Sequence, residues 1–202
     1  MAGNDKIFEG LCRQAGLIRC YDPLHTFDMA MALSSQPLPK GNRVAIISGG
    51  GGYCVTMAES AVAWGLDVPQ LDPSSSEKIK EILPPFAPPP WNPVDAAADI
   101  RPMTYARALE ILLSLDYIDG ILMMIPFMFP LQLRSPASVR ELMDATEIIC
   151  GLPGKFHKPL IGNMIPVVSV GPALNLFKSA GIPFYATQDE SDYQGKRCRN
   201  EG

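Results

Sequence analysis

Four consecutive glycines, Gly49 to Gly52, form the pattern in this chain that points most directly to chemistry. They follow the apolar stretch 43–48 and lead into an amphipathic segment that begins at Tyr53 and Cys54. A strand, a glycine loop and a helix in that order aim unpaired backbone N–H groups and a helix dipole at an anion. The sequence therefore predicts a phosphate-binding loop made of Gly49, Gly50, Gly51, Gly52, Tyr53 and Cys54. A tight turn with close strand-to-helix packing is the alternative use of the same glycines, and it stays open.

Residues of the classes that usually carry catalysis are sparse. The two histidines, His25 and His157, occupy positions that favour a structural or solvated role. Cys54 would be a nucleophile only if its sulfur faced solvent, and because no partnered base lies nearby in the sequence we expect a packed thiol. We assign no catalytic residue and no metal site to the chain.

Two other groups are candidates for contact with a substrate or a neighbouring domain. Asn92 and Asp95 follow a run of prolines and are typical of turns, but they are also placed to reach the edge of a sheet. Phe127, Met128 and Phe129 lie between two prolines, where they are either ordinary core or the wall of an acyl pocket or docking surface.

Apolar periodicity and capping signals predict the elements that must position these residues. Helices are expected over 4–15, 24–33, 53–64, 74–83, 103–115, 136–150 and 171–180, and strands over 43–48, 67–71, 119–125, 159–162 and 182–185. Ser76 and Ser135 are the expected caps of the helices that they begin. The segment 84–93 is too rich in proline for regular structure.

Alternating helices and continuously apolar strands indicate an α/β protein with a parallel sheet that is covered on both faces. We expect a flavodoxin-like, doubly wound, five-stranded sheet of order 2-1-3-4-5 with an N-terminal helical extension. In that order ligands meet the loops after the first and third strands, here 49–53 and 126–131. The expected division is a helical extension and linker over 1–42, the flavodoxin-like domain over 43–186 and an irregular tail over 187–202.

Composition narrows the classes of partner. The net charge of −4 argues against binding to a nucleic-acid backbone. No apolar run reaches the roughly 18 residues that a membrane-spanning helix needs, so we expect no membrane association. The five cysteines lack CxxC spacing, which fits a reducing, cytoplasmic location better than a zinc site or a disulfide framework.

Several separated motifs resemble those of the NDP-forming acyl-CoA synthetases, which are relatives of succinyl-CoA synthetase. They are the stretch 36–52 with its glycines, Leu83-Pro-Pro-Phe followed by Asn92-Pro-Val-Asp95, and Lys158-Pro-Leu-Ile-Gly-Asn163 with Ala180-Gly-Ile-Pro183. The likeness covers about residues 2 to 190 in a consistent order.

The resemblance implies that this chain is the flavodoxin-like CoA-ligase domain of such an enzyme, which converts an acid, CoA and a nucleoside triphosphate to acyl-CoA, nucleoside diphosphate and phosphate. The implied partners are the CoA-binding, phosphohistidine and ATP-grasp domains. CoA, ATP or GTP and Mg²⁺ are expected for the complete enzyme, with no cofactor assigned to this chain. The helix after the glycine loop would point its N-terminus at the phosphohistidine, and the chain would be inactive alone.

Three departures from the family pattern bear on this interpretation. The opening Met1-Ala-Gly-Asn-Asp5 is similar to the end of the phosphohistidine motif, so we expect that histidine upstream of Met1. Tyr53 and Cys54 stand where many members have Pro-Gly, which places a bulky ring at the helix mouth. Residues 188–202 do not continue the apolar helix that the family leads us to expect, and a truncated gene or an excised fragment would explain both ends.

Two alternatives come from other functional classes: a stand-alone module that binds a flavin or nucleotide phosphate, and a non-catalytic interaction domain. An isolated module would expose surfaces that its neighbours otherwise cover, including Phe86 and Trp91. We therefore expect a homo-oligomer, with the N-terminal helices contributing to the contact.

Overall fold

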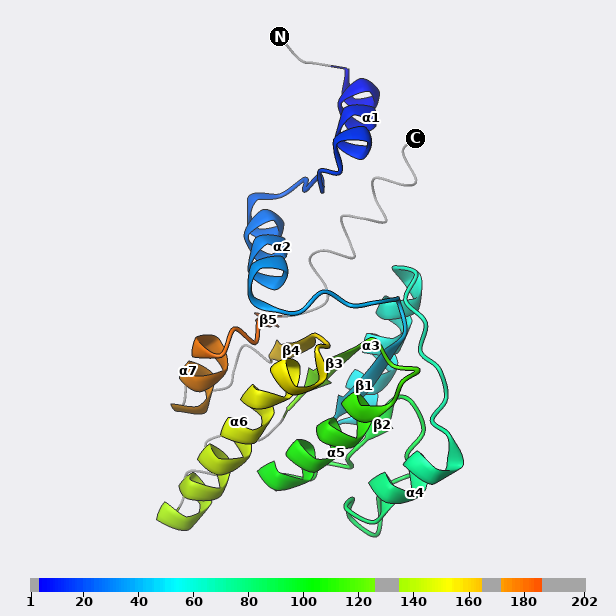
Figure 1. The fold of residues 1–202 in the computed structure, drawn as a ribbon. Helices are drawn as coiled ribbons and strands as arrows, with labels where there is room; N and C mark the ends of the chain where they lie inside the picture. The colour runs from blue at the N-terminus through cyan, green and yellow to red at the C-terminus, as the bar shows by residue number, and fades with distance from the viewer. Residues whose placement is uncertain (1–3, 126–134, 165–171, 187–202) are drawn as a thin grey trace.

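The computed structural model describes residues 4–125, 135–164 and 172–186. Their elements are α1 (Asp5–Ala15), α2 (Pro23–Ser35), β1 (Val44–Ser48), α3 (Gly51–Ala63), α4 (Pro73–Lys80), β2 (Val94–Asp95), α5 (Pro102–Ser114), β3 (Gly120–Met124), α6 (Pro136–Phe156), β4 (Leu160–Met164), α7 (Pro172–Ser179) and β5 (Phe184–Ala186) (Figure 1). Four helices begin at a side-chain oxygen that accepts backbone N–H groups, from Asn4, Asp22, Asp72 and Ser135.

The five strands form one parallel sheet of order β2-β1-β3-β4-β5. This confirms the α/β class and the flavodoxin-like order expected from the sequence. β1, which leads into the glycine loop, pairs with β2 on one side and with β3 on the other. Its residues are all buried, as expected for a strand covered on both faces.

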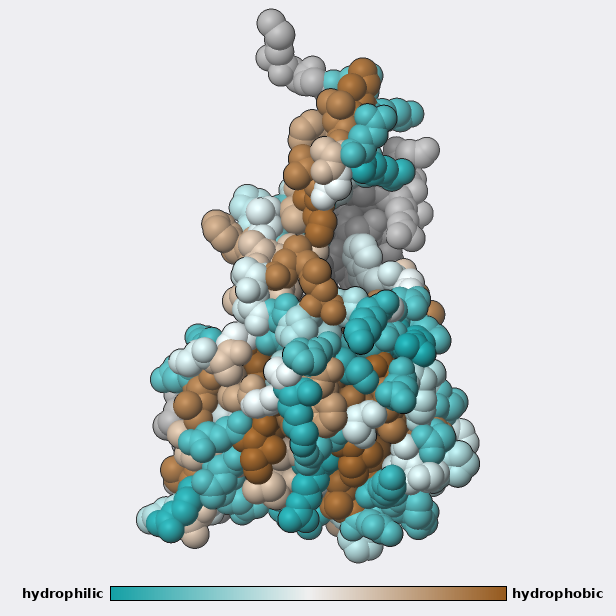
Figure 2. All heavy atoms as spheres, in the orientation of Figure 1, coloured by the Kyte–Doolittle hydropathy of each residue, from teal (hydrophilic) through white to brown (hydrophobic). Residues whose placement is uncertain are grey.

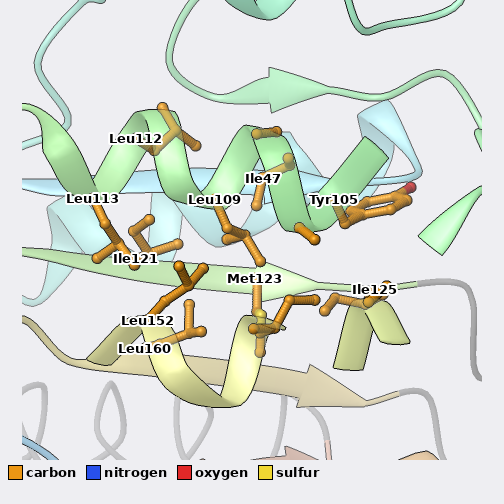
Figure 3. Packing of buried hydrophobic residues seen from close by; sticks show 14 of the residues in the cluster. Ile47, Tyr105, Leu109, Leu112, Leu113, Ile121, Met123, Ile125, Leu152 and Leu160 are labelled. Atoms are coloured by element: carbon orange, nitrogen blue, oxygen red, sulfur yellow. The ribbon is translucent and has the colours of Figure 1, made fainter. Parts of the chain in front are cut away.

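Helices cover the sheet unequally. On one face α3 packs Met57 and Ala61 against Val44, Ile46 and Met124. The other face carries the main core, in which α5, α6 and α7 cover the strands. Figure 3 shows side chains of α5, such as Leu109, and of α6, such as Leu152, converging on the buried strand residues.

The strand expected over 67–71 is wrong. Asp67 makes only an isolated parallel bridge with Arg43, and the second strand of the sheet is instead Val94–Asp95, after the proline-rich segment. The physical reason is the buried side chain of Asn92, which occupies the edge of β1. Its Nδ2 donates to Val44 O at 2.8 Å and Pro69 O at 2.9 Å, and its Oδ1 accepts from Ile46 N at 2.9 Å.

Helix boundaries differ from expectation where caps and glycines decide them. The fourth helix begins after Asp72, whose Oδ1 accepts from Ser75 N at 3.0 Å, so Asp72 and not Ser76 is its cap. α3 begins at Gly51, two residues before the expected start. α6 continues to Phe156, through Pro153, because Leu152 and Pro153 are buried in the core side of the helix. Ser135 caps α6 as expected.

The N-terminal extension reaches the sheet at the amino ends of its strands. Gln36 is buried there and joins the start of β4 to the turn before β5: its Oε1 accepts from Leu160 N at 3.0 Å, and its Nε2 donates to Gly181 O at 2.7 Å. Tyr185 adds a hydrogen bond from its hydroxyl to Asp28 O at 2.8 Å. Beyond these contacts α2 and α1 project away from the α/β body (Figure 1). Over the described ranges, no helix is long and apolar enough to span a bilayer.

Replacing Asn92 by alanine should destabilise the fold severely. The change leaves Val44 O, Ile46 N and Pro69 O without their partner inside the protein, and each stranded group costs about 1–3 kcal/mol. We expect a loss of about 3 kcal/mol or more in the free energy of unfolding, measured by urea denaturation. Asn42→Ala is the control, because that exposed side chain makes one hydrogen bond, to Gly65 O at 3.0 Å. Equal losses in the two variants would contradict the role given to Asn92.

Candidate functional site

The glycine loop leaves the carboxyl end of β1 and is held by the last residue of that strand. Ser48 is fully buried, and its Oγ accepts from Gly50 N at 3.1 Å and donates to Gly50 O at 3.2 Å. Gly50 is the N-cap of α3, and no side chain caps this helix. Ser48 therefore fixes the turn, and the N-terminus of α3 has no side-chain cap.

Three backbone N–H groups at this N-terminus have no partner in the helix: those of Gly51, Gly52 and Tyr53, in its first turn. Two residues of the predicted loop use their backbone N–H groups within the chain. Gly50 N–H donates to Ser48, and Cys54 N–H donates to Gly50 O at 3.1 Å as the first bond of the helix. Gly52 and Tyr53 are exposed, so an anion approaching the helix mouth meets them directly.

A second loop, residues 95–99, lies against the glycine loop. Ala96 N donates to Ser48 O at 2.8 Å and Ala98 N donates to Gly49 O at 2.7 Å. Ala97 and Ala98 adopt left-handed backbone conformations, with φ of 51° and 57°, a region that non-glycine residues seldom occupy. This pair of loops was not expected from the sequence, because the second strand that precedes 95–99 was placed elsewhere.

Asp95 brings a negative charge to the helix mouth. As the last residue of β2 it pairs with Ser48, and its Oδ1 accepts from Ala97 N at 2.8 Å. A Cβ atom added to Gly51 would lie 2.7 Å from Asp95 Oδ2, so the carboxylate stands beside the first residue of α3. The expectation that Asp95 reaches this edge of the sheet agrees with its position; its role there is not shown.

Lack of space for a side chain explains only part of the run of four glycines. None of Gly49 to Gly52 has a positive φ, so the run does not serve a left-handed turn. A Cβ atom at Gly51 would collide with Asp95, whereas one at Gly52 would meet nothing within 4 Å. Gly51 is thus the position where an added side chain would have to displace the Asp95 carboxylate.

The side chains of Cys54 and Tyr53, at the start of α3, differ in burial. The Cys54 thiol is buried, and its Sγ donates to Val94 O at 3.4 Å. Burial, with a further effect from the nearby Asp95 carboxylate, raises the pKa of the Cys54 thiol to about 11. The packed thiol expected from the sequence is therefore what the structure contains. Tyr53 is 38% exposed, and its ring lies beside Gly50, with Cδ2 3.4 Å from where a Cβ atom of that residue would be.

The other candidates are not brought to this site. Asn92 is buried beside the amino half of β1, and its amide donates to Val44 O of that strand and to Pro69 O of the loop beside it. Phe127, Met128 and Phe129 lie outside the described residues, as does the tail from 187. Phe86 and Trp91, on the proline-rich segment, are 77% and 63% exposed.

The geometry thus combines a parallel flavodoxin-like sheet with a glycine-initiated helix at its carboxyl edge. Residues 44–193 match the family described as the Ligase-CoA domain. The chain belongs to this Ligase-CoA family. The match includes β1, the glycine loop, the 95–99 loop and every later strand.

Named relatives are ADP-forming ligases. The chain is 35% identical over 130 residues to the acetate–CoA ligase [ADP-forming] II of Archaeoglobus fulgidus, covering 60% of this chain and 19% of that protein. It is 29% identical over 188 residues to the acetate–CoA ligase [ADP-forming] I subunit alpha of Pyrococcus furiosus, covering 92% of this chain and 38% of the subunit. Each relative is therefore much longer than the part that matches.

A solved structure shares the fold over nearly the whole chain. The crystal structure of PH0766 from Pyrococcus horikoshii OT3 superposes with a TM-score of 0.72 at 28% sequence identity. The superposition covers 91% of this chain and 41% of that one. The present chain thus spans less than half the length of each of these three proteins.

Alanine substitutions at Gly51 and Gly52, in the first turn of α3, should have different effects on stability. Gly51→Ala places a Cβ against Asp95 Oδ2 and pulls the carboxylate from Ala97 N, whereas Gly52→Ala adds a methyl group in open space. Alanine favours the helix at both positions. We expect Gly51→Ala to be less stable than Gly52→Ala by about 1–2 kcal/mol in urea denaturation. Equal stability of the two variants would show that Asp95 does not pack against Gly51.

The Cys54 thiol should resist alkylation. Since the thiolate is the reactive form and the pKa is raised to about 11, Cys54 stays protonated at neutral and mildly alkaline pH. Peptide mass spectrometry after iodoacetamide treatment should find Cys20, which is partly exposed, modified first. Denaturing urea should remove the difference. Modification of Cys54 as fast as Cys20 in the folded protein would rule out the buried thiol.

Proposed function

We propose that this chain supplies the flavodoxin-like CoA-ligase part of an NDP-forming acyl-CoA synthetase. The complete enzyme would convert an acid, CoA and ATP or GTP to acyl-CoA, nucleoside diphosphate and phosphate. Membership of the Ligase-CoA family and similarity to two ADP-forming acetate–CoA ligases support this proposal. The single structural observation that supports it is the uncapped N-terminus of α3 at the carboxyl edge of the sheet, where ligands of doubly wound folds bind.

The proposed task of α3 is to hold a phosphoryl group during transfer. A phosphoryl group on histidine or on an acyl carboxylate carries nearly two negative charges. The N–H groups of Gly51, Gly52 and Tyr53 can donate to its oxygens, and the helix dipole adds a favourable field over the first turn. Because these donors are fixed by Ser48 and by the 95–99 loop, they need little rearrangement when charge arrives.

Asp95 would set the affinity of this N-terminus for anions. Its carboxylate beside Gly51 already neutralises part of the helix dipole and would repel a phosphoryl group that approached the same donors. We propose that the site is therefore poised for transient rather than tight phosphate binding, which suits a group that must leave again. Tyr53, over Gly50, would limit the size of what enters.

The remaining chemistry is proposed for other domains: a CoA-binding domain, a phosphohistidine domain and an ATP-grasp pair. Among the residues that the structure describes, no three His, Cys, Asp or Glu side chains come together in a way that would hold a metal ion. The family match starts at residue 44, which supports the proposed domain start at 43.

The chain alone should not make acyl-CoA. The proposed route passes the phosphoryl group from a nucleotide to a histidine, and we place both the nucleotide site and that histidine on the partner domains. Purified protein with acetate, CoA, ATP or GTP and Mg²⁺ should form no acetyl-CoA above the uncatalysed background, measured by chromatography of the thioester. The alpha subunit of the Pyrococcus furiosus ligase I, assayed with its own partner subunit, is the positive control. Turnover by the isolated chain would overturn the assignment of the missing steps.

Inorganic phosphate should bind at the first turn of α3, and Asp95→Asn should strengthen that binding about tenfold, or ~1.4 kcal/mol. The asparagine keeps an oxygen for Ala97 N–H while removing the charge. Backbone amide NMR during phosphate titration should show the largest shifts at Gly51, Gly52 and Tyr53.

Glu59→Gln is the matched control for that titration, because it removes an equal charge from an exposed position further along α3. It should leave the affinity close to that of the parent. If the three amides do not respond in the parent or in Asp95→Asn, the proposed phosphate site fails. If they respond equally in both, the site stands and the role given to Asp95 fails.

A further inference from the structure

Three residues outside the candidate site hold the far end of the 95–99 loop. Asp99 is 6% exposed, and its Oδ1 accepts from Arg101 N at 2.9 Å. The Arg101 guanidinium pairs with the same carboxylate, with Nε 2.9 Å from Oδ1 and Nη2 2.7 Å from Oδ2. The Asp99 carbonyl oxygen accepts from the Tyr105 hydroxyl at 2.8 Å. We call Asp99, Arg101 and Tyr105 the loop clamp.

Tyr105 is the buried half of the loop clamp. It lies near the start of α5 and is fully buried, and Figure 3 shows its ring in the core toward the carboxyl end of β3. Burial, with further effects from the Asp99 and Asp95 carboxylates, raises the pKa of the Tyr105 hydroxyl far above its usual value, so the group remains a hydrogen-bond donor. Because close packing fixes a buried ring, the core determines where this donor meets the loop.

Arg101 is the exposed half of the loop clamp. Its side chain is 56% exposed, and its Nη2 also donates to Ile82 O at 3.3 Å, in the segment after α4. Figure 2 shows a largely hydrophilic surface at the lower edge of the α/β body, where α6 begins. Replacing Arg101 would leave the buried Asp99 charge without its partner. Tyr105 is therefore the member of the loop clamp that can be tested without changing a charge.

The loop clamp acts on a part of the backbone that is held in an unusual conformation. The two alanines before Asp99 have φ of 51° and 57°, a region that non-glycine residues seldom occupy. Asp99 N donates to Ala96 O at 2.9 Å, and Ala97 N donates to Asp95 Oδ1 at 2.8 Å. Hydrogen bonds therefore link Tyr105, through the loop, to the carboxylate that stands beside the first residue of α3.

We propose that Tyr105 is a positioning residue for the proposed phosphate site: through Asp99 it keeps the loop in its left-handed form and holds the Asp95 carboxylate beside Gly51. Tyr105 itself touches no phosphate. Without its hydroxyl the alanines relax toward ordinary conformations, and the carboxylate moves away from the N–H donors of α3. The repulsion between Asp95 and an incoming anion then falls. The inference rests on the proposed function, in which those donors hold a phosphoryl group.

A purely structural role for the same hydroxyl makes a different prediction. Phenylalanine fills the same space in the core, so in that case Tyr105→Phe lowers stability through the lost hydrogen bond and leaves the phosphate affinity unchanged. The positioning role predicts a change in affinity that depends on the charge of Asp95. Measuring the affinity with and without that charge therefore separates the two roles.

The test is a titration of the full chain with inorganic phosphate, followed by backbone amide NMR at Gly51, Gly52 and Tyr53. The proteins compared are the parent, Tyr105→Phe, Asp95→Asn and the double variant. Tyr105→Phe should bind phosphate about threefold more tightly than the parent, which is less than the effect of Asp95→Asn because the charge is displaced rather than removed. In the Asp95→Asn background Tyr105→Phe should leave the affinity unchanged.

Tyr185→Phe is the matched control. It also removes a hydroxyl that donates to a backbone carbonyl oxygen, that of Asp28, at 2.8 Å. Tyr185 lies on β5, at the edge of the sheet opposite β2 and its loop. The control variant should therefore bind phosphate with the affinity of the parent.

A second measurement needs no phosphate. In the parent, Gly51→Ala pushes a methyl group against Asp95 Oδ2, so it should unfold at a lower urea concentration than Gly52→Ala. In the Tyr105→Phe background the carboxylate is free to yield, and the difference between the two urea midpoints should fall by about half or more. In the Tyr185→Phe background the difference should stay as in the parent.

Three results would overturn the inference: Tyr105→Phe leaves both the affinity and the midpoint difference unchanged, it weakens phosphate binding, or it strengthens binding equally when Asp95 is Asn. Failure of the proposed function looks different. If the amides respond to phosphate in none of the proteins, the phosphate site fails, and the comparison of Gly51→Ala with Gly52→Ala alone decides whether Tyr105 positions Asp95.

Discussion

The arrangement of the candidate site depends on the side-chain amide of Asn92, which takes the place of a strand. By bonding to Val44 O and Ile46 N it satisfies the amino half of the β1 edge, where the backbone of a longer second strand would otherwise pair. β2 is consequently confined to two residues, which pair with Ile47 and Ser48. The strand therefore ends level with β1, and Asp95 emerges beside the glycine loop. A buried side chain near one end of the sheet thus determines which charge faces the helix at the other.

The position of Asp95 determines the charge at the N-terminus of α3. The uncapped N-terminus of α3 attracts anions, and the Asp95 carboxylate is an anion already held beside it by Ala97 N–H. The loop that carries Asp95 keeps Ala97 and Ala98 in left-handed conformations that cost about 1–2 kcal/mol each, and the bonds to Ser48 O and Gly49 O hold it there. The neighbouring thiol adds no charge, because burial keeps Cys54 protonated. The site consists of backbone donors and one carboxylate, which suits binding and release of an anion more than covalent chemistry.

The sequence predicted the fold well where apolar residues follow a long continuous or periodic pattern, as in β1, β3 and α5. It failed at β2, because two residues have no periodicity and the prolines before them indicate only irregular structure. It also failed to connect Asn92 with β1, since a hydrogen bond across 46 residues leaves no local trace. The glycine run identified the site, but only the packing of Asp95 distinguishes Gly51 from Gly52. Caps were read correctly where serine precedes proline, as at Ser135, and misread where Asp72 preceded a run of serines.

The two ends of the sheet differ in the groups that they leave without a partner inside the described chain. At the carboxyl end the unsatisfied groups are polar N–H donors, which require an anion or water. At the amino end Gln36 binds Leu160 N and Gly181 O, and the helices α1 and α2 that precede it expose apolar side chains. Because all carboxyl ends of a parallel sheet lie on one side, the glycine loop and the helices α1 and α2 lie at opposite ends of the strands. The proposed anion site at the glycine loop is therefore separated from α1 and α2 by the length of the strands.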